Sequence, residues 1–160
     1  MTGIEARDAT PEDIPVLVEL YRKLEDEMTA LHPMWPIANG LDEPVADSFT
    51  ETLSDPDTLV LIGTIDDYPF GFIVAREEEL LMQAQGERVG SIRFIFVDHD
   101  AREVGVGEMM REMTMDLLRE RGITKFDAHV LPGHRLVKNF FESGSFSART
   151  IIMYHDDARP

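Results

Sequence analysis

The feature that most constrains the fold is a buried strand that runs through a glycine-containing loop into an amphipathic helix. Phe94, Ile95, Phe96 and Val97 are apolar without alternation, which is typical of a strand buried on both faces. Apolar residues at helical spacing then predict a helix that ends before Gly122. They are Val106, Met109, Met110, Met113, Leu117 and Leu118. Such a helix predicts a parallel crossover and therefore an α/β fold.

The remaining segments supply helices and strands that suit a layered fold. A helix is predicted from a start at Thr10-Pro11 to Leu31, because a hydroxyl cap precedes proline at the first helical position. A shorter helix is predicted from Pro44 to Leu53. Strands are predicted over residues 58–65, 70–75, 88–97, 126–131 and 147–155, a longer turn over 76–86 and a short helix over 134–143. With 160 residues and no linker, the chain is expected to be one domain, 1–160.

The charge balance excludes some partners. Lys and Arg number 15 against 31 Asp and Glu, which gives a formal net charge of -16. Such a chain repels phosphates and anionic lipid, so neither nucleic acid nor membrane is expected as a partner. The acid slightly favours a cationic small molecule or basic peptide, although it also serves as solvating surface. No apolar run could span a bilayer and no secretory leader is recognised, so a cytoplasmic location is expected.

The loop between the buried strand and the helix, DHDAREVGVGEMM, has the pattern of a phosphate site. Three strand–loop–helix motifs compete for it. A dinucleotide fingerprint needs a third glycine where the chain has Met110, and a P-loop needs Gly-Lys-Ser/Thr where residues 107–109 are Gly-Glu-Met. A dinucleotide or nucleoside triphosphate enzyme is therefore disfavoured.

The pattern that remains is Arg102-x-x-Gly105-x-Gly107 at the start of a helix. The first helical turn leaves backbone N–H groups unpaired and carries about +0.5 of an elementary charge. Glycines at 105 and 107 let an anion approach the backbone, and Arg102 adds a cation. The alternative is that the glycines only form a tight turn. With strand, arginine and helix together, we interpret the loop as an anion site.

This arrangement resembles motif A, Gln/Arg-x-x-Gly-x-Gly/Ala, of the GCN5-related N-acetyltransferase (GNAT) family, which binds the pyrophosphate of acetyl-CoA. The resemblance implies a mixed, mostly antiparallel central sheet flanked by helices, with splayed central strands. It also implies acetyl-CoA as co-substrate, with its pantetheine arm on the backbone of Ile95, Phe96 and Val97. The pyrophosphate is then expected on the loop and first helical turn. These residues are Arg102, Glu103, Val104, Gly105, Val106 and Gly107.

A second stretch, from His134 to Phe146, resembles the family pattern Asn-x-x-Ala-x-x-Phe-Tyr-Glu-x-x-Gly-Phe at the same spacing. His134 replaces Asn, Phe141 replaces Tyr and Ser145 replaces Gly. In the family the Tyr often reprotonates the departing CoA thiolate, and Phe has no proton to give. His134 is a candidate substitute as proton donor. Alternatively, His134 and Phe141 only pack against the coenzyme.

The absence of cysteine and of a Gly-x-Ser-x-Gly elbow disfavours an acyl-enzyme. This favours direct attack of a primary amine on the thioester in a ternary complex, with the Val97 N–H as the family-like oxyanion donor. An alkylammonium has a pKa of about 10, so the amine must lose a proton. His129 is the candidate acceptor, because it shares a strand face with Asp127 and Leu131 beside the loop. The other interpretation is a partly buried structural histidine.

The acceptor stays open between a small-molecule amine and a protein amine. The family places the hairpin region beside the acceptor pocket, so Glu77, Glu78 and Glu79 either attract a cationic amine or form a solvated turn. A metal is not expected, because three consecutive residues, 98–100, cannot all turn toward one ion. Since the fold often pairs through its last strands, the resemblance implies that a homodimer can form. A catalytically weak or silent acyl-CoA-binding module is the alternative function.

Overall fold

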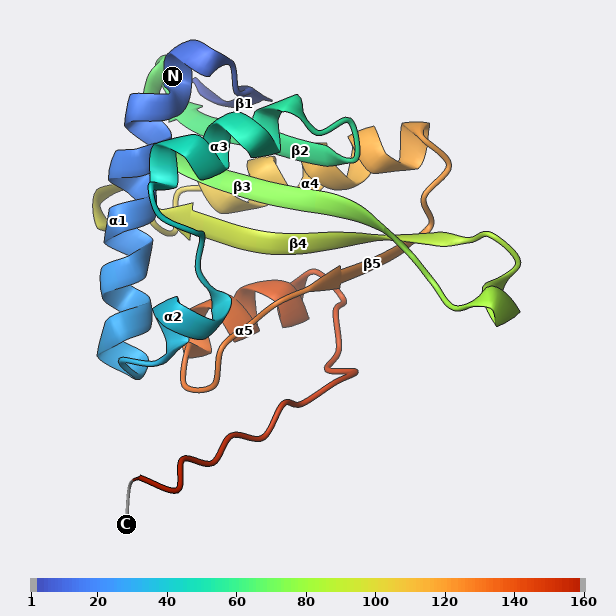
Figure 1. Cartoon of the computed structure of the whole chain (residues 1–160). Coiled ribbons are helices and arrows are strands. Elements are labelled where there is room, and N and C mark those ends of the chain that lie inside the picture. The colour runs from blue at the N-terminus through green and yellow to red at the C-terminus, as the bar shows by residue number, and fades with distance from the viewer. Residues whose placement is uncertain (1–2, 159–160) are drawn as a thin grey trace.

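The computed structural model describes residues 3–158 and contains one five-stranded sheet between two layers of helices (Figure 1). The sheet order is β1-β2-β3-β4-β5, and every neighbouring pair is antiparallel except β4 and β5. The strands are β1 (Ile4–Asp8), β2 (Thr58–Ile65), β3 (Tyr68–Glu79), β4 (Arg88–Val97) and β5 (Lys125–Ala128). The helices are α1 (Ile14–Leu31), α2 (Trp35–Asn39), α3 (Val45–Ser54), α4 (Val106–Glu120) and α5 (Arg135–Ser143), and single 3₁₀ turns cover Pro11–Asp13, Met82–Ala84 and His99–Ala101. The expected mixed, mostly antiparallel α/β fold is confirmed.

The two faces of the sheet are covered by different helices. Val60 and Ile62 of β2 pack into a cluster with α1 and α3, whereas Leu59 and Leu61 pack into a second cluster with α4. Because side chains alternate between the faces of a strand, β2 must be apolar throughout. The core therefore lies in two layers, one on each side of the sheet.

Helix α1 confirms the first predicted helix, with its α-helical part starting at Ile14 after the 3₁₀ turn. Asp13 holds this start in place. Its carboxylate accepts hydrogen bonds from the Thr10 N–H at 2.8 Å and from the two terminal nitrogens of Arg7 at 2.8 and 2.9 Å. The buried face is apolar at helical spacing, with Leu17, Leu20, Tyr21, Leu24 and Met28 in the core.

Several polar segments form elements that the sequence pattern does not predict. Strand β1 is short and charged, and it forms because it pairs with β2 at the sheet edge. Strand β3 continues past the predicted end at residue 75 to Glu79, because residues 76–79 pair with β4 in a hairpin that projects beyond the layers (Figure 1). Helix α2 forms between the first two predicted helices, in a segment for which no element is predicted. Pairing between distant segments, rather than local hydrophobicity, forms these strands.

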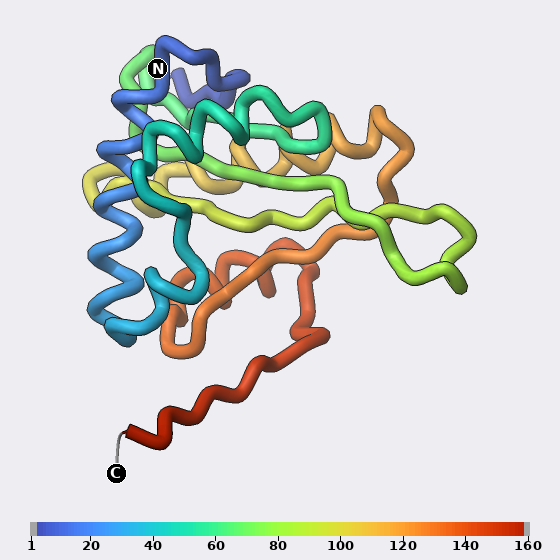
Figure 2. The backbone as a smooth tube through the Cα atoms, in the orientation of Figure 1, coloured from blue at the N-terminus to red at the C-terminus, as the bar shows by residue number. Residues whose placement is uncertain are grey.

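The predicted last strand, residues 147–155, is wrong for this chain taken alone. Within the described residues this segment pairs with no strand, and its backbone donates and accepts no hydrogen bond with other backbone groups. It runs extended below α5 and away from the sheet (Figure 2). Ile151, Ile152 and Met153 are 77%, 82% and 87% exposed. The outer edge of β5 is left without a partner as well.

Candidate active site

Strands β4 and β5 separate halfway along β4. They pair from Val89 to Ile92, and the His129 N–H donates to the Ile92 carbonyl at 3.0 Å as the last link. From Phe94 to Val97, β4 pairs with β3 alone. Strand β5 therefore ends at Ala128 rather than at the predicted residue 131. The splayed central strands are confirmed, and Ile95, Phe96 and Val97 lie along the edge that opens.

The loop after β4 brings a free helix start to the end of this edge. Gly105 has a φ of +104°, a left-handed backbone that suits glycine, and its carbonyl accepts from the Met109 N–H at 3.0 Å. In the part of the chain that the structure describes, the N–H groups of Val106, Gly107 and Glu108 donate to no other group. Three unpaired amides at a helix N-terminus can bind an anion.

Glu103 and Val104 form the outer part of this loop. Glu103 is also left-handed, with a φ of +66°, and such strained residues persist where the surrounding structure holds them. Both side chains are exposed.

Arg102 lies against the end of β4. Its Nε donates to the Val97 carbonyl at 2.8 Å, and its guanidinium lies 5.6 Å from the centre of the Phe96 ring. Its terminal nitrogen also pairs with the carboxylate of Glu27, from α1. The structure thus places the predicted cation beside the predicted pantetheine edge, but with a carboxylate partner that the sequence analysis missed.

Glu27 connects the two sides of the opening. One oxygen binds Arg102 and lies 3.6 Å from His99 Nε2, and the other lies 3.4 Å from Nε2 of His134, the residue that precedes α5. Burial favours the neutral acid, but His134 and Arg102 outweigh it and lower the pKa of the Glu27 carboxyl. One carboxylate therefore holds the loop and the start of α5 together. Its position at the edge of the apolar stripe of α1 is the only sequence signal for it.

Phe141, at the usual tyrosine position, is a core residue. It is 3% exposed, and its ring centre lies 5.1 Å from that of Phe140 and 5.2 Å from that of Phe146. Phe140 in turn covers Gly107, where an added Cβ would lie 3.1 Å from the ring. Gly107 therefore has a packing role between α4 and α5, in addition to its free amide.

His129 follows β5 on the face that points away from α4. Ala128 and Val130 pack into the α4 cluster, whereas Leu131 packs into the α1 cluster, which confirms the predicted alternation. Burial, followed by the charge of Arg93, lowers the pKa of the His129 imidazole. Its neutral form, which can accept a proton, is therefore dominant at neutral pH.

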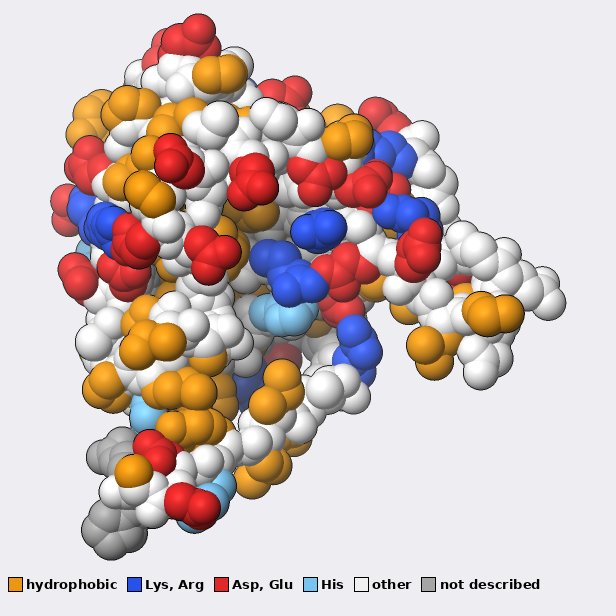
Figure 3. Space-filling view, viewed as in Figure 1, with side chains coloured by type: hydrophobic (Ala, Val, Ile, Leu, Met, Phe, Trp, Pro, Cys, Tyr) orange, Lys and Arg blue, Asp and Glu red, His pale blue; other side chains and the backbone are white. Residues whose placement is uncertain are grey.

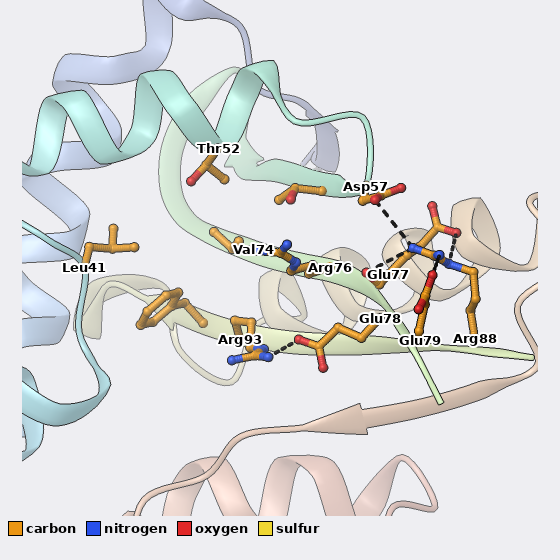
Figure 4. Close-up of a pocket in the computed structure, with 12 residues that line it drawn as sticks. Leu41, Thr52, Asp57, Val74, Arg76, Glu77, Glu78, Glu79, Arg88 and Arg93 are labelled. Carbon is orange, nitrogen blue, oxygen red and sulfur yellow. Dashed lines mark hydrogen bonds and ion pairs between the residues drawn. The ribbon is translucent and has the colours of Figure 1, made fainter. Parts of the chain in front are cut away.

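A hollow of about 580 Å³ lies on the same face of the sheet, over β3 and β4, and is called here the β3–β4 hollow (Figure 4). It is lined by Leu41, Thr52, Asp57, Thr58, Val74, Arg76, Glu77, Glu78, Glu79, Arg88, Arg93 and Phe94. The three predicted glutamates do line it. A second hollow of about 410 Å³ includes Glu27, Phe96 and His99 and lies beside the loop.

The acidic stretch at the start of the loop is engaged in structure. The Asp98 carboxylate pairs with Lys23 Nζ at 2.5 Å and accepts from the Asp100 N–H at 3.3 Å. Within residues 3–158, no three His, Asp or Glu side chains are grouped so that they could hold a metal ion. Nor is any helix of that range long and apolar enough to cross a membrane.

Comparison with known proteins agrees with this geometry. The sequence profile of the acetyltransferase (GNAT) family matches residues 18–145. A putative acetyltransferase from Agrobacterium tumefaciens is similar in structure, with a TM-score of 0.72, 20% identity, and coverage of 95% of this chain and 99% of that chain. No curated protein sequence matches significantly.

Two further solved structures are similar. A ribosomal-protein-alanine N-acetyltransferase from Brucella melitensis biovar Abortus has a TM-score of 0.73 and 15% identity, covering 96% of this chain and 99% of that chain. An aminoglycoside N-acetyltransferase in complex with CoA has a TM-score of 0.75 and 16% identity, covering 98% and 97%. At these identities the likeness shows the fold alone.

Proposed function

The chain belongs to the acetyltransferase (GNAT) family and is an acyltransferase, and from this premise we propose that it moves the acetyl group of acetyl-CoA to a primary amine by direct attack in a ternary complex. The observation that carries the proposal is the unpaired edge of β4, which leads directly to three free amides at the start of α4. The proposal treats residues 1–160 as a single acetyltransferase domain.

In this proposal acetyl-CoA lies along the opening between β4 and β5. The backbone of Ile95, Phe96 and Val97 would hold the pantetheine arm, since this edge has no strand partner. The pyrophosphate would bind the loop and helix start, Arg102, Glu103, Val104, Gly105, Val106 and Gly107, where free amides and one arginine favour an anion. His134 would flank the coenzyme from α5, and the buried Phe141 would support α5 by packing.

The chemistry needs two proton transfers. The amine nitrogen of the acceptor would attack the carbonyl carbon of the thioester, and the neutral imidazole of His129 would take a proton from that amine. The Val97 N–H is the proposed hydrogen-bond donor to the oxyanion that forms. The C–S bond then breaks and the thiolate leaves with the electron pair. Because Phe141 has no proton to give, His134 is the proposed donor to the thiolate, held by Glu27. The products are an N-acetyl amine and CoA.

The acceptor is proposed as a small-molecule or protein amine. The similar structures include an aminoglycoside and a ribosomal-protein-alanine acetyltransferase, so the fold serves both classes.

We also propose a homodimer, in which residues 147–155 of one copy pair with the free edge of β5 of the other. Within residues 3–158, the extended segment and the outer edge of β5 both lack backbone hydrogen-bond partners, which supports this pairing. In one chain the segment is held by side chains only, through Arg149 on Asp127 and the Tyr154 ring beside Trp35. Light scattering should give twice the chain mass for residues 1–160 and the single mass for a chain that ends at Phe146. A monomeric full-length chain would contradict it.

The first test of the function is calorimetric titration with acetyl-CoA, followed by a thiol-release assay over a panel of amines. Binding with amine-dependent release of CoA supports acetyl transfer. Binding without release for any amine, including peptide N-termini, supports the silent acyl-CoA-binding module instead. Absence of binding overturns the placement of the coenzyme.

A further inference from the structure

The carboxylates at one end of the β3–β4 hollow share two arginines. Arg88 lies 3.5 Å from Asp57 and 3.7 Å from Glu77 and Glu79 (Figure 4). Arg121 adds a second ion pair to Glu77 at 2.8 Å. Each of these carboxylates therefore has an arginine within 4 Å, although the acids at this end outnumber the arginines.

The other end of the hollow holds the remaining cations. Glu78 pairs with Arg93, from the neighbouring strand. Arg76 lines the hollow beside them, and it makes no hydrogen bond or ion pair with any residue in the range 3–158. Figure 3 shows Lys and Arg side chains and a histidine gathered in the hollow of this face, with Asp and Glu side chains around it. At this end the lining holds two arginines, Arg76 and Arg93, against one carboxylate, Glu78, and the charge of Asp55, outside the lining, also acts on Arg76.

Arg93 is placed where the reaction is proposed to occur. The pairing of β3 with β4 shifts by one residue here: Val74 faces Phe94 and Ala75 faces Ile92, so Arg93 is the extra residue of a bulge. It directly follows Ile92, the last residue of β4 that is bonded to His129. The bulge thus aims an arginine into the hollow at the point where β4 and β5 separate.

We infer that the acceptor is an amine that carries an anionic group, a carboxylate or a phosphate, which Arg76 and Arg93 bind. This inference rests on the proposed acetyl transfer and names the substrate class for the same site. The anionic group would pair with the free guanidinium of Arg76 and share Arg93 with Glu78, while the amine is directed toward His129. This inference differs from the expectation of a cationic acceptor that net charge favours, because it rests on the two arginines at one end of the hollow.

The test compares matched acceptors in the thiol-release assay. Amino acids are measured against their amides and against the amines that lack the carboxylate, and aminoalkyl phosphates against the corresponding amino alcohols. We expect kcat/KM to be at least about tenfold higher for the anionic member of a pair. One charge-assisted hydrogen bond between the anionic group and Arg76 gives a difference of this size. The two arms distinguish carboxylate from phosphate. Equal or faster turnover of the uncharged members overturns the inference while leaving acetyl transfer intact.

Substitutions of Arg76 test whether this residue causes the preference for anionic acceptors. Arg76→Gln should raise KM for the anionic acceptor about tenfold or more and leave the KM for acetyl-CoA unchanged, and Arg76→Lys should restore part of it. Arg22→Gln, which removes one exposed arginine on α1 outside the hollow, is the control for net charge. Equal effects of Arg76→Gln and Arg22→Gln overturn the assignment.

A second measurement covers the case in which no amine of the panel turns over. The thermal shift caused by succinate and by inorganic phosphate is then measured in the presence of CoA. Loss of the shift in Arg76→Gln but not in Arg22→Gln supports the inference. No shift in the parent protein, or the same shift in both variants, overturns it. Failure of acetyl-CoA itself to bind would instead count against the proposed function.

Discussion

Two roles compete for Gly107, and a pair of substitutions separates them. An added Cβ would lie 3.1 Å from Phe140 Cε1 and 3.6 Å from Val97 Cγ2, so the glycine lets α5 pack closely on α4. Its amide is also one of the three free N–H groups at the helix start. Gly107→Asp adds bulk and a negative charge, whereas Gly107→Asn adds nearly the same bulk without the charge.

The steric cost is common to both variants. The Phe140 ring must move by a few tenths of an ångström, and overpacking of this kind costs about 1–3 kcal/mol. Replacing glycine in a helix returns about 0.3–0.5 kcal/mol. Both variants should therefore lose about 0.5–2.7 kcal/mol of unfolding free energy, or roughly 1–11 °C in Tm for a chain of this size.

The charge separates the two variants. A carboxylate about 4 Å from one phosphate charge costs about 4 kcal/mol at an effective dielectric constant of about 20, roughly a thousandfold in Kd. We expect Gly107→Asp to bind acetyl-CoA at least about a hundredfold more weakly than Gly107→Asn at low salt, with a smaller ratio at high salt. Calorimetry with acetyl-CoA and thermal unfolding of both variants measure this. Equal Kd values for the two variants would show that the glycine serves packing alone and that the loop holds no anion.

Four more measurements test particular charges. His129→Gln should lower kcat/KM by about 10²- to 10⁴-fold and remove the acid limb of its pH profile; because the pKa of His129 is lowered from 6.5 by burial and Arg93, the parent limb should lie below pH 6.5, and an unchanged profile would assign the proton to solvent. Glu27→Gln should tighten acetyl-CoA binding severalfold by calorimetry, because it frees Arg102 from a competing carboxylate; weaker binding would mean that Glu27 is needed to position the arginine. The hydrogen bond from Arg7 lowers the pKa of Asp13 from 3.8 to about 2, so its stabilising effect is complete above pH 3.8 and lost as the pH falls through about 2; denaturant unfolding of Asp13→Asn should show a difference from the parent near neutral pH that shrinks between pH 4 and 2, and a constant difference would refute the ion pair. Finally, stopped-flow association of acetyl-CoA should accelerate as salt rises from about 0.01 to 0.15 M, because the Debye length falls from about 30 to about 8 Å and screens the repulsion from the acidic surface.

The sequence predicts the parts of the fold that depend on local periodicity. The spacing of apolar residues predicts three helices and two strands. Each helix, α1, α3 and α4, buries one apolar stripe, and the strands β2 and β4 are buried on both faces along much of their length. The loop motif also lies where it is predicted, since a strand that leads into a helix start fixes its geometry locally. The structure of such a helix, strand or loop can therefore be predicted from the sequence of that segment alone.

The remaining features depend on contacts between distant residues. Glu27 and Arg102 are 75 positions apart, and no local pattern joins an acid inside α1 to a loop after β4. The charged end of β3 forms a strand only because β4 pairs with it. The segment 147–155 has the composition of a strand, but within the described residues its backbone pairs with no strand, although the outer edge of β5 is free. A strand forms only when two segments pair, so the pattern of one segment alone does not predict the end of β3 or the state of residues 147–155.

The chain has a large negative net charge, but arginines lie in both proposed binding sites, and acidic side chains pair with two of them. Arg102 is paired with Glu27, and Arg93 with Glu78, whereas Arg76 is unpaired. In the proposed complexes, an anionic ligand would compete with Glu27 for Arg102 and share Arg93 with Glu78, so its affinity would be reduced by the ion pairs that are already present. Such an exchange binds the ligand modestly and lets the product leave, because the carboxylate returns to the arginine as the anion departs. If both proposals hold, the paired carboxylates limit how tightly each site binds an anion, while the arginines provide the preference for an anion.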